Sequence, residues 1–292
     1  MRRVVVATIL GIEVGACGLV LGIEDRTVTR GPDAGLADGP SPENENDASL
    51  DAPAADAPSA DVSLDAAADA FDPKGLAGLE LWLDADRGVI LDGTEVALWK
   101  DQSGKVRDVQ RGNATSPSIR QAKLPGTTRD ALQFEPGVDA AASAGYLVRT
   151  GFTLPQPLTV AIAMYPTRAV TGYYDGFFAG TEVPSVGLFR FDTSFRAVAG
   201  YDTTFTAFSG AKPWTVGLHV VIAAFDGASS SLSVDGETTT GSLANAPLTG
   251  VVLSVGGGSY HGYIGEVLVY GRHLGTAEQL AIDRYLSKRY GP

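Results

Sequence analysis

The sequence predicts an all-β fold, a two-sheet antiparallel β-sandwich with one C-terminal α-helix. Short apolar runs recur beyond residue 71, and most are bounded by Gly, Pro, Asp or Ser. Many short strands at this spacing are typical of a sandwich or a jelly roll. Glycine is abundant, at 36 of 292 residues, and only 19% of residues are charged. No helical pattern alternates with the runs, which argues against a parallel α/β sheet.

The first 17 residues have the pattern of a signal peptide. A basic head, Met1-Arg2-Arg3, precedes a mostly apolar run at residues 4–12 that is too short to span a bilayer of about 30 Å. Residues 14–17, Val-Gly-Ala-Cys, resemble the lipobox of bacterial lipoproteins. The resemblance implies that Cys17 is lipidated and becomes the new N-terminus. Gly18, where some lipoproteins have Asp, implies sorting to the outer membrane or cell surface in a Gram-negative cell.

Two other interpretations of this segment stay open. Val-Gly-Ala at residues 14–16 also fits ordinary signal peptidase cleavage, which would release a secreted protein. An uncleaved anchor reaching residue 23 would place Glu13 near its middle, at a cost of about 2.5–3.5 kcal/mol. Cys17 is the only cysteine, so the chain has no intrachain disulfide.

Residues 18–71 are predicted to be a disordered acidic linker rich in Asp, Ala and Pro. Residues 31–71 contain eight Asp, two Glu and no Lys or Arg, so they account for −10 of the net charge of −12. Such a composition buries too little apolar area to offset chain entropy. The remaining chain is nearly neutral, which argues against nucleic acid as a partner because phosphate binding needs clustered Lys and Arg.

Residues 72–292 are predicted to form the folded domain, expected to be a monomer. Its terminal helix is expected at 276–290, with Thr276 and Gln279 as a capping box and Ile282, Leu286 and Tyr290 as the buried stripe. Apolar runs predict strands at 79–83, 95–99, 132–134, 158–164, 187–191, 219–225, 231–234, 250–255 and 263–270.

Three stretches resemble the laminin-G-like, concanavalin A-like jelly-roll family. They are Leu-Trp-Leu-Asp-Ala-Asp at 81–86 with Trp-Lys-Asp-Gln-Ser-Gly at 99–104, the segment 217–236 with its two Asp-Gly turns, and Gly-Tyr-Ile-Gly-Glu-Val-Leu-Val-Tyr at 262–270. Their order and spacing cover the whole domain. The resemblance implies the jelly-roll fold and says much less about a ligand.

The sequence contains no recognisable catalytic motif. Retaining glucanases of this fold have Glu-x-Asp-x-x-Glu on one strand, and no such string occurs here. Asp84 and Asp86 share one strand face, but no Glu follows at the required step. The three histidines are far apart in sequence and have no neighbouring cysteine, which argues against zinc. We therefore expect a domain that is not an enzyme.

Calcium is the one cofactor that the resemblance suggests. Many laminin-G domains hold Ca²⁺ at one rim, and oxygen ligands at the matching motif are available from Asp84, Asp86, Asp101 and Ser103. The alternative is that Asp101 and Ser103 form an Asx-type turn with no metal.

Sugar recognition would need aromatic platforms with polar edges on one face. Several aromatic side chains and a histidine lie in or beside segments with loop character. The candidates are Tyr173, Tyr174, Tyr201, Trp214, Tyr260 and His261. For any one ring, packing in the core is the alternative, and Trp82 and Trp99 are assigned to the core.

The resulting functional hypothesis is a lipid-anchored surface protein that displays a non-catalytic carbohydrate- or protein-binding module. Its partner would be a polysaccharide or another surface protein. Two alternatives remain, a polysaccharide hydrolase or lyase on the same fold and a structural envelope protein without a soluble ligand.

Overall fold

The structure, a computed structural model, describes residues 71–112, 119–134, 145–168, 174–200, 206–255 and 260–291. The predicted signal peptide, Cys17 and the acidic linker up to residue 70 lie outside these residues.

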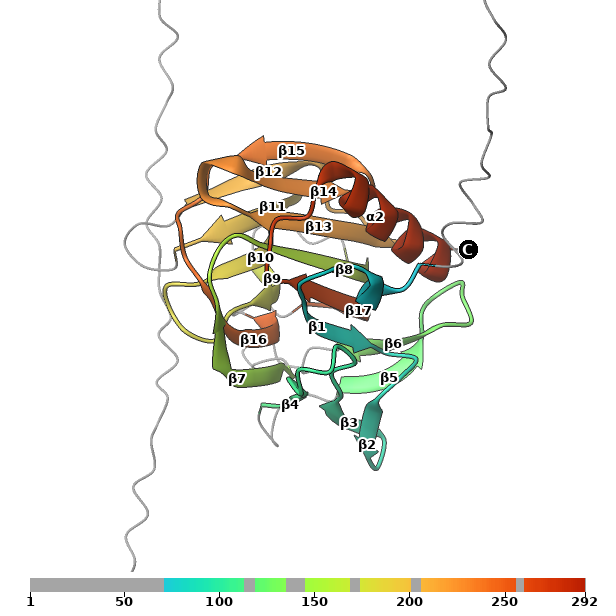
Figure 1. The fold of residues 1–292 in the computed structure, drawn as a ribbon. Helices are drawn as coiled ribbons and strands as arrows, with labels where there is room; N and C mark the ends of the chain where they lie inside the picture. Colours follow the sequence, from blue (N-terminus) through green and yellow to red (C-terminus); the bar gives the residue numbers. More distant parts are fainter. Residues whose placement is uncertain are drawn as a thin grey trace, which may run out of the picture. The chain divides into compact units, whose positions relative to one another are not determined.

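Two antiparallel sheets face each other in a β-sandwich, as the sequence predicts (Figure 1). The first sheet has the order β15 (Glu237–Gly241), β14 (Ser230–Val234), β13 (His219–Phe225), β8 (Leu158–Pro166), β17 (Gly262–Tyr270), β6 (Asp130–Phe134) and β5 (Ile119–Lys123), with β1 (Leu79–Asp84) also paired to β17. The second has the order β12 (Thr206–Pro213), β11 (Ser194–Ala199), β10 (Val186–Phe191), β9 (Tyr174–Ala179), β16 (Leu248–Val255), β7 (Leu147–Leu154), β4 (Val109–Arg111), β3 (Glu95–Trp99) and β2 (Val89–Asp92).

The central strands of the first sheet are buried on both faces. On β8, Val160 and Ile162 point into the main core between the sheets, while Ala161 and Ala163 belong to a second apolar layer outside the sheet. This division follows from the two-residue period of a strand. The sequence shows it as an unbroken apolar run, as expected for a strand with two covered faces.

Helix α2 (Thr276–Tyr290) covers that outer face, lying across the first sheet in Figure 1. Its stripe of Ile282, Leu286 and Tyr290 is buried against the sheet, as predicted. Gly265 on β17 makes room for the Tyr290 ring, because a Cβ there would lie 2.4 Å from it. Among the described residues, no helix has the length and apolar character of a transmembrane span.

The predicted capping box of α2 is wrong by one residue. The N-cap is Gly275, and its backbone N–H donates to the Glu278 carboxylate at 2.9 Å. Thr276 is already the first helical residue, and the side-chain amide of Gln279 donates to the Leu274 carbonyl. Glu278 is the capping residue at this helix start, and its carboxylate is held in position because it also pairs with Arg272 at 2.6 Å.

The second family-like stretch has a structural explanation. Asp235 and Gly236 have positive φ values of 49° and 79° in the turn between β14 and β15. The Asp235 carboxylate accepts hydrogen bonds from the Val220 amide and pairs with His219, both at 2.8 Å. The histidine and aspartate of this stretch therefore tie β13 to the neighbouring hairpin.

Candidate functional site

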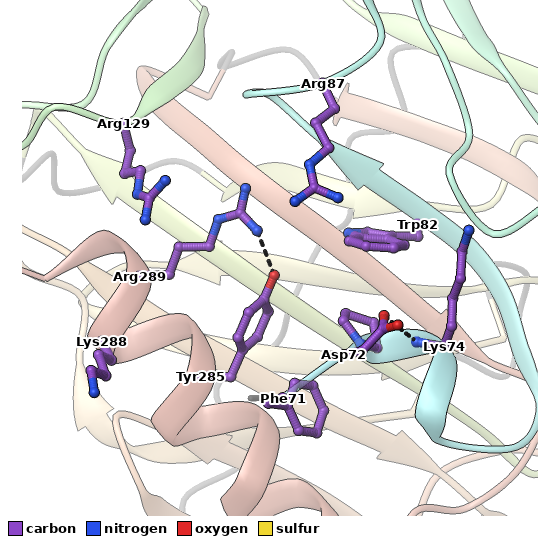
Figure 2. Close-up of a pocket in the computed structure, with 10 residues that line it drawn as sticks. Phe71, Asp72, Lys74, Trp82, Arg87, Arg129, Tyr285, Lys288 and Arg289 are labelled. Carbon is purple, nitrogen blue, oxygen red and sulfur yellow. Dashed lines mark hydrogen bonds between the residues drawn. The ribbon is translucent and has the colours of Figure 1, made fainter. Parts of the chain in front are cut away.

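A surface pocket of about 610 Å³ lies where the start of the domain meets the end of α2 (Figure 2). The short 3₁₀ helix η1 (Pro73–Gly75), strand β1 and the last turns of α2 contribute most of its wall. The lining residues are Phe71, Asp72, Pro73, Lys74, Trp82, Arg87, Arg129, Tyr285, Lys288 and Arg289. Its volume lies within the range of about 300–1,000 Å³ typical of small-molecule sites.

Three aromatic residues form the apolar part of the pocket. Trp82 is 4% exposed and Tyr285 is 7% exposed, so both present an edge or part of a face while the rest of each ring is packed. Phe71 is only partly buried, and its ring lies 5.0 Å from the ring of Tyr285. The burial of Trp82 confirms its assignment to the core.

Five cationic side chains surround these rings, against one acidic lining residue, Asp72. The Lys74 ammonium and the Arg87 guanidinium each lie 5.7 Å from the centre of the Trp82 ring, a distance typical of cation–π contacts. In Figure 2, Arg87 and Arg129 extend toward Arg289 from the opposite wall to the helix. The pocket is thus locally basic in a chain whose net charge is −12.

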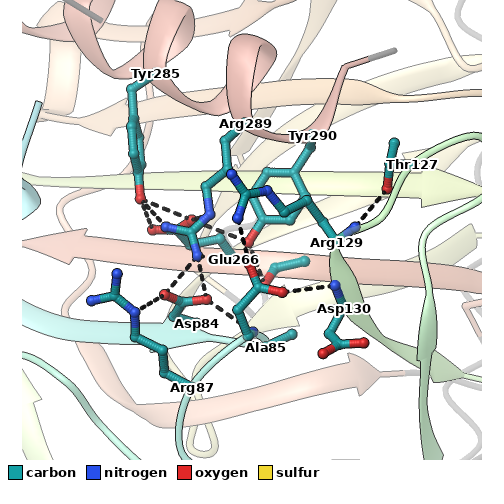
Figure 3. Close-up of polar contacts among 12 residues, drawn as sticks. Asp84, Ala85, Arg87, Thr127, Arg129, Asp130, Glu266, Tyr285, Arg289 and Tyr290 are labelled. Atoms are coloured by element: carbon teal, nitrogen blue, oxygen red, sulfur yellow. Dashed lines mark hydrogen bonds and ion pairs between the residues drawn. The ribbon is translucent and has the colours of Figure 1, made fainter. Parts of the chain in front are cut away.

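Behind the pocket, Arg289 joins three acidic residues, two at or just after the end of β1 and one from β17 (Figure 3). Its guanidinium donates to both Asp84 oxygens at 2.8 Å and to Asp86 at 3.0 Å, and its Nε lies 3.5 Å from Glu266. Asp84 and Glu266 face each other across β1 and β17, and neither side chain is exposed to solvent. We call Asp84, Asp86, Glu266 and Arg289 the buried ion cluster.

Glu266 is the most deeply held member of the buried ion cluster. It accepts hydrogen bonds from the Trp82 indole at 2.7 Å, the Tyr285 hydroxyl at 3.0 Å and the Tyr290 hydroxyl at 3.2 Å. Burial is the main cause that raises its pKa to about 7, and the Asp84 charge adds to it, while Arg289 and the hydroxyl and indole donors act in the opposite direction. Burial likewise raises the pKa of Asp84.

The predicted calcium ligands lie in two separate arrangements. Asp84 and Asp86 bond to Arg289, and Asp86 also accepts from the Asp130 amide at 2.8 Å. Asp101 accepts from the amide and hydroxyl of Ser103, both at 2.8 Å. The contacts of Asp101 and Ser103 are those of the Asx-type turn. Over the described ranges, no group of three or more His, Cys, Asp or Glu could hold a metal ion.

Asp101 also connects this turn to β1. Its carboxylate accepts from the amides of Trp82 and Arg107, both at 3.0 Å, in addition to Ser103.

We expect Asp101→Ala to lower the free energy of unfolding by about 2 kcal/mol, because partly buried donors lose their acceptor. Asp101→Asn, which keeps one acceptor oxygen, should cost less. Urea denaturation measures the stability of both variants, and Asp92→Ala, at an exposed aspartate, is the control. If Asp101→Ala is as stable as this control, the Asp101 carboxylate does not stabilise the contact between the turn and β1.

Chelation tests the metal prediction. We expect the melting temperature of the protein to be the same before and after treatment with EDTA, because N–H and guanidinium donors already occupy the predicted ligand oxygens. A drop that added Ca²⁺ reverses would establish the rim calcium site instead.

The predicted aromatic platforms separate into buried and undescribed residues. Trp214 and Tyr260 are 5% and 0% exposed, and their rings pack 6.2 Å apart against Phe177. Neither is an open stacking surface, because the sandwich core closes over them. Tyr173 and Tyr201 lie outside the described residues, and only the backbone of Tyr174 is described, at the start of β9.

His261 is the one predicted platform residue with a described, partly exposed side chain. It lies 3.4 Å from the guanidinium of Arg168. Burial and then the nearby positive charge of Arg168 lower its pKa. The structure thus groups Trp214, Tyr260 and His261 at a location distinct from the residues that line the pocket.

Sequence reasoning missed the pocket and most of the buried ion cluster. One signal was available, because Arg289 falls seven residues after Ile282 and four after Tyr285, on the buried stripe of α2. A cation on such a stripe requires a buried acid as partner.

No family model and no curated protein matches the chain. Solved structures match in fold. The binding domain of botulinum neurotoxin DC, in complex with rat synaptotagmin II, has a TM-score of 0.54 at 8% identity, covering 74% of this chain and 52% of its own. A structure of botulinum neurotoxin type C, whose cell entry depends on interaction with two ganglioside molecules, has a TM-score of 0.52 at 8% identity, covering 72% and 51%.

Trypanosoma rangeli sialidase in complex with sialic acid aligns with a TM-score of 0.49 at 17% identity, over 73% of this chain and 33% of the sialidase. The chain therefore spans about a third of the sialidase and about half of the toxin chains. At such identities the toxin matches show a jelly-roll-like β-sandwich, and they do not identify a ligand.

Proposed function

We propose that the domain is a non-catalytic binding module for a carbohydrate or a surface protein, with the pocket beside α2 as its binding site. The observation that supports this most directly is the pocket itself, in which the partly buried Phe71 ring and the narrow exposed edges of Trp82 and Tyr285 lie beside cationic side chains. Most of the lining is polar or charged, and such groups beside apolar surface can fix the orientation of a bound ligand.

The arrangement of the acids favours binding over catalysis. A glycosidase needs two carboxyl groups that reach the scissile bond from opposite sides. Here Asp84 and Glu266 are fully buried, and Arg289 lies against both. A substrate in the pocket would meet Arg289, Trp82 and Tyr285 before it met either acid.

A polysaccharide hydrolase or lyase remains the second candidate, and one observation favours it. The pKa of Glu266 is raised to about 7, a value suited to a general acid or base at neutral pH. Such an enzyme would have to move Arg289 or Trp82 during its cycle to expose the carboxyl group.

The proposal extends to the presentation of the domain. The lipobox-like sequence at 14–17 supports export with a lipid anchor on Cys17, and the acidic segment that follows would act as a spacer between membrane and domain. We expect the wild-type protein to partition with membranes and Cys17→Ser to lose this attachment. Equal membrane association of the two proteins in fractionated cells would exclude the anchor.

A glycan array probed with the full-length chain tests the binding function, and product release from the same polysaccharides tests the enzymatic alternative. We expect specific array hits without new reducing or unsaturated ends. Hits accompanied by product release would establish an enzyme. An empty array, with no adhesion defect in a deletion strain, would favour a structural envelope protein.

A further inference from the structure

We infer that the pocket selects an acidic sugar, and that Lys74, Arg87 and Arg129 bind its carboxylate or sulfate group. This inference rests on the proposed binding function and specifies its ligand class. It follows from the charge of the lining, the way in which the two arginines are held, and the apolar surface beside them.

Arg87 and Arg129, on the wall opposite the helix, each make one ion pair with an acid beneath the pocket. Arg87 contacts Asp84 through Nε at 3.3 Å and its side chain is 60% exposed. Arg129 contacts Asp86 through one terminal nitrogen at 3.4 Å and its side chain is 49% exposed. A guanidinium has five N–H donors, so both side chains keep donors for a further acceptor.

The same contacts pre-orient the arginines. Asp84 and Asp86 are themselves held by Arg289, whose side chain is only 10% exposed. Arg87 and Arg129 therefore contact carboxylates whose positions are already fixed. These two arginine side chains would lose less conformational entropy when a ligand binds than unrestrained surface arginines would. Planar guanidinium groups match the two oxygens of a carboxylate or sulfate.

Lys74 adds a charge from the opposite side. In Figure 2 its side chain runs beside the Trp82 ring. Its exposed ammonium contacts that ring, and the described residues give it no acidic partner within ion-pair distance. Cations from three separate segments, at residues 74, 87 and 129, thus converge on one pocket. An anion bound there would relieve their mutual repulsion.

The aromatic lining distinguishes a sugar from a simple anion. The partly buried Phe71 ring offers apolar surface to the C–H face of a pyranose ring, and the narrow exposed edges of Trp82 and Tyr285 extend it. Inorganic phosphate would use the cations alone. The combination of both surfaces therefore points to a sugar with an acidic substituent.

Isothermal titration of the full-length chain tests this with four probes: a galacturonate oligosaccharide, its carboxyl-reduced neutral form, a sulfated galactan oligosaccharide of equal length, and inorganic phosphate. We expect at least one acidic oligosaccharide to bind at least tenfold more tightly than the neutral form and than phosphate, with an affinity that falls as salt rises. The tighter of the two acidic sugars identifies the substituent.

Two variants locate the binding site. Arg87→Gln/Arg129→Gln should weaken acidic-sugar binding at least tenfold, and Lys74→Gln should weaken it severalfold without uncovering a buried acid. The matched control is Lys212→Gln/Arg284→Gln, which removes two positive charges outside the pocket lining and should change affinity less than twofold. Melting temperatures verify that each variant is folded.

Several outcomes would overturn the inference. They are equal binding of the neutral and acidic sugars, equal loss in the control and pocket variants, no binding of either acidic sugar, and binding of phosphate as tight as that of the sugars. A peptide of residues 31–70 is a further probe, because displacement of the acidic sugar by this peptide at equal concentration would show that charge alone governs the site. If a neutral glycan binds the array, is unaffected by these variants, and neither acidic sugar binds, the binding function stays intact and the acidic ligand is excluded.

Discussion

Arg289→Met is expected to destabilise the domain by about 3–5 kcal/mol at pH 7, because it leaves buried carboxylates without their common partner. Asp84 and Glu266 are fully buried. Of the hydrogen bonds that Arg289 donates, two, both of 2.8 Å, go to Asp84. A loss of this size is comparable to the whole stability of a marginal domain. Urea denaturation of the wild-type and variant proteins measures it.

Two comparisons separate this effect from simple loss of helix packing. Arg284→Met removes an exposed arginine from the same helix and should change stability by less than about 0.5 kcal/mol. Asp84→Asn/Glu266→Gln/Arg289→Met also removes the two fully buried acidic charges and should be more stable than Arg289→Met alone, because Asp86, the remaining acid of the cluster, still has Arg129 as a partner. If the triple variant is as unstable as the single one, unpaired charge is not the cause.

Low pH should partly rescue Arg289→Met. Without the arginine, the pKa values of its acidic partners rise, and protonation removes the uncompensated charges as the pH falls. The stability difference from wild type should therefore narrow between pH 7 and pH 5. A difference that stays constant over this range would contradict the role of the carboxylates.

The wild-type protein should lose stability as the pH rises from about 5 to 8 because of Glu266. Its pKa is raised from 4.5 to about 7, so in this range the folded state binds a proton more tightly than the unfolded state. The stabilisation is complete below the unfolded pKa and is lost as the pH passes through about 7. A rise of this size corresponds to at most about 3.5 kcal/mol.

Glu266→Gln removes this titration. We expect the variant to gain stability relative to wild type as the pH rises from 5 to 8, whatever constant offset the amide introduces. The control is Glu278→Gln, because Arg272 lowers the pKa of Glu278 to about 2 and the residue is ionised in both states above pH 5. Urea denaturation at each pH gives the curves; a Glu266→Gln curve parallel to wild type would show that Glu266 does not titrate in this range.

The buried ion cluster and the pocket share their residues, which links stability to binding. Asp84 and Asp86 hold Arg289 on one side and contact Arg87 and Arg129 on the other. The cluster therefore positions the pocket's cations, in the way that supporting shells orient functional groups.

The sequence by itself determined the strongly apolar elements. Strands β8, β13 and β17 and helix α2 lie where apolar runs and a four-residue spacing predict them, because full burial requires apolar side chains at every covered position. Strands whose side chains are exposed or partly exposed were not predicted. Examples are β12 and β15, which contain several polar residues, and the short β2, whose mainly apolar side chains are mostly exposed; their pairing needs only backbone hydrogen bonds to a neighbour.

Only the tertiary structure decided the site. Phe71, Trp82, Arg129 and Arg289 are separated by tens to hundreds of positions, and each alone fits an ordinary surface or core role. They meet because β1 pairs with β17 and α2 folds back over that sheet. Local periodicity records how deeply a residue is buried, and it does not record which distant residue lies beside it. The chemistry of this protein therefore follows from strand order, which no local pattern specifies.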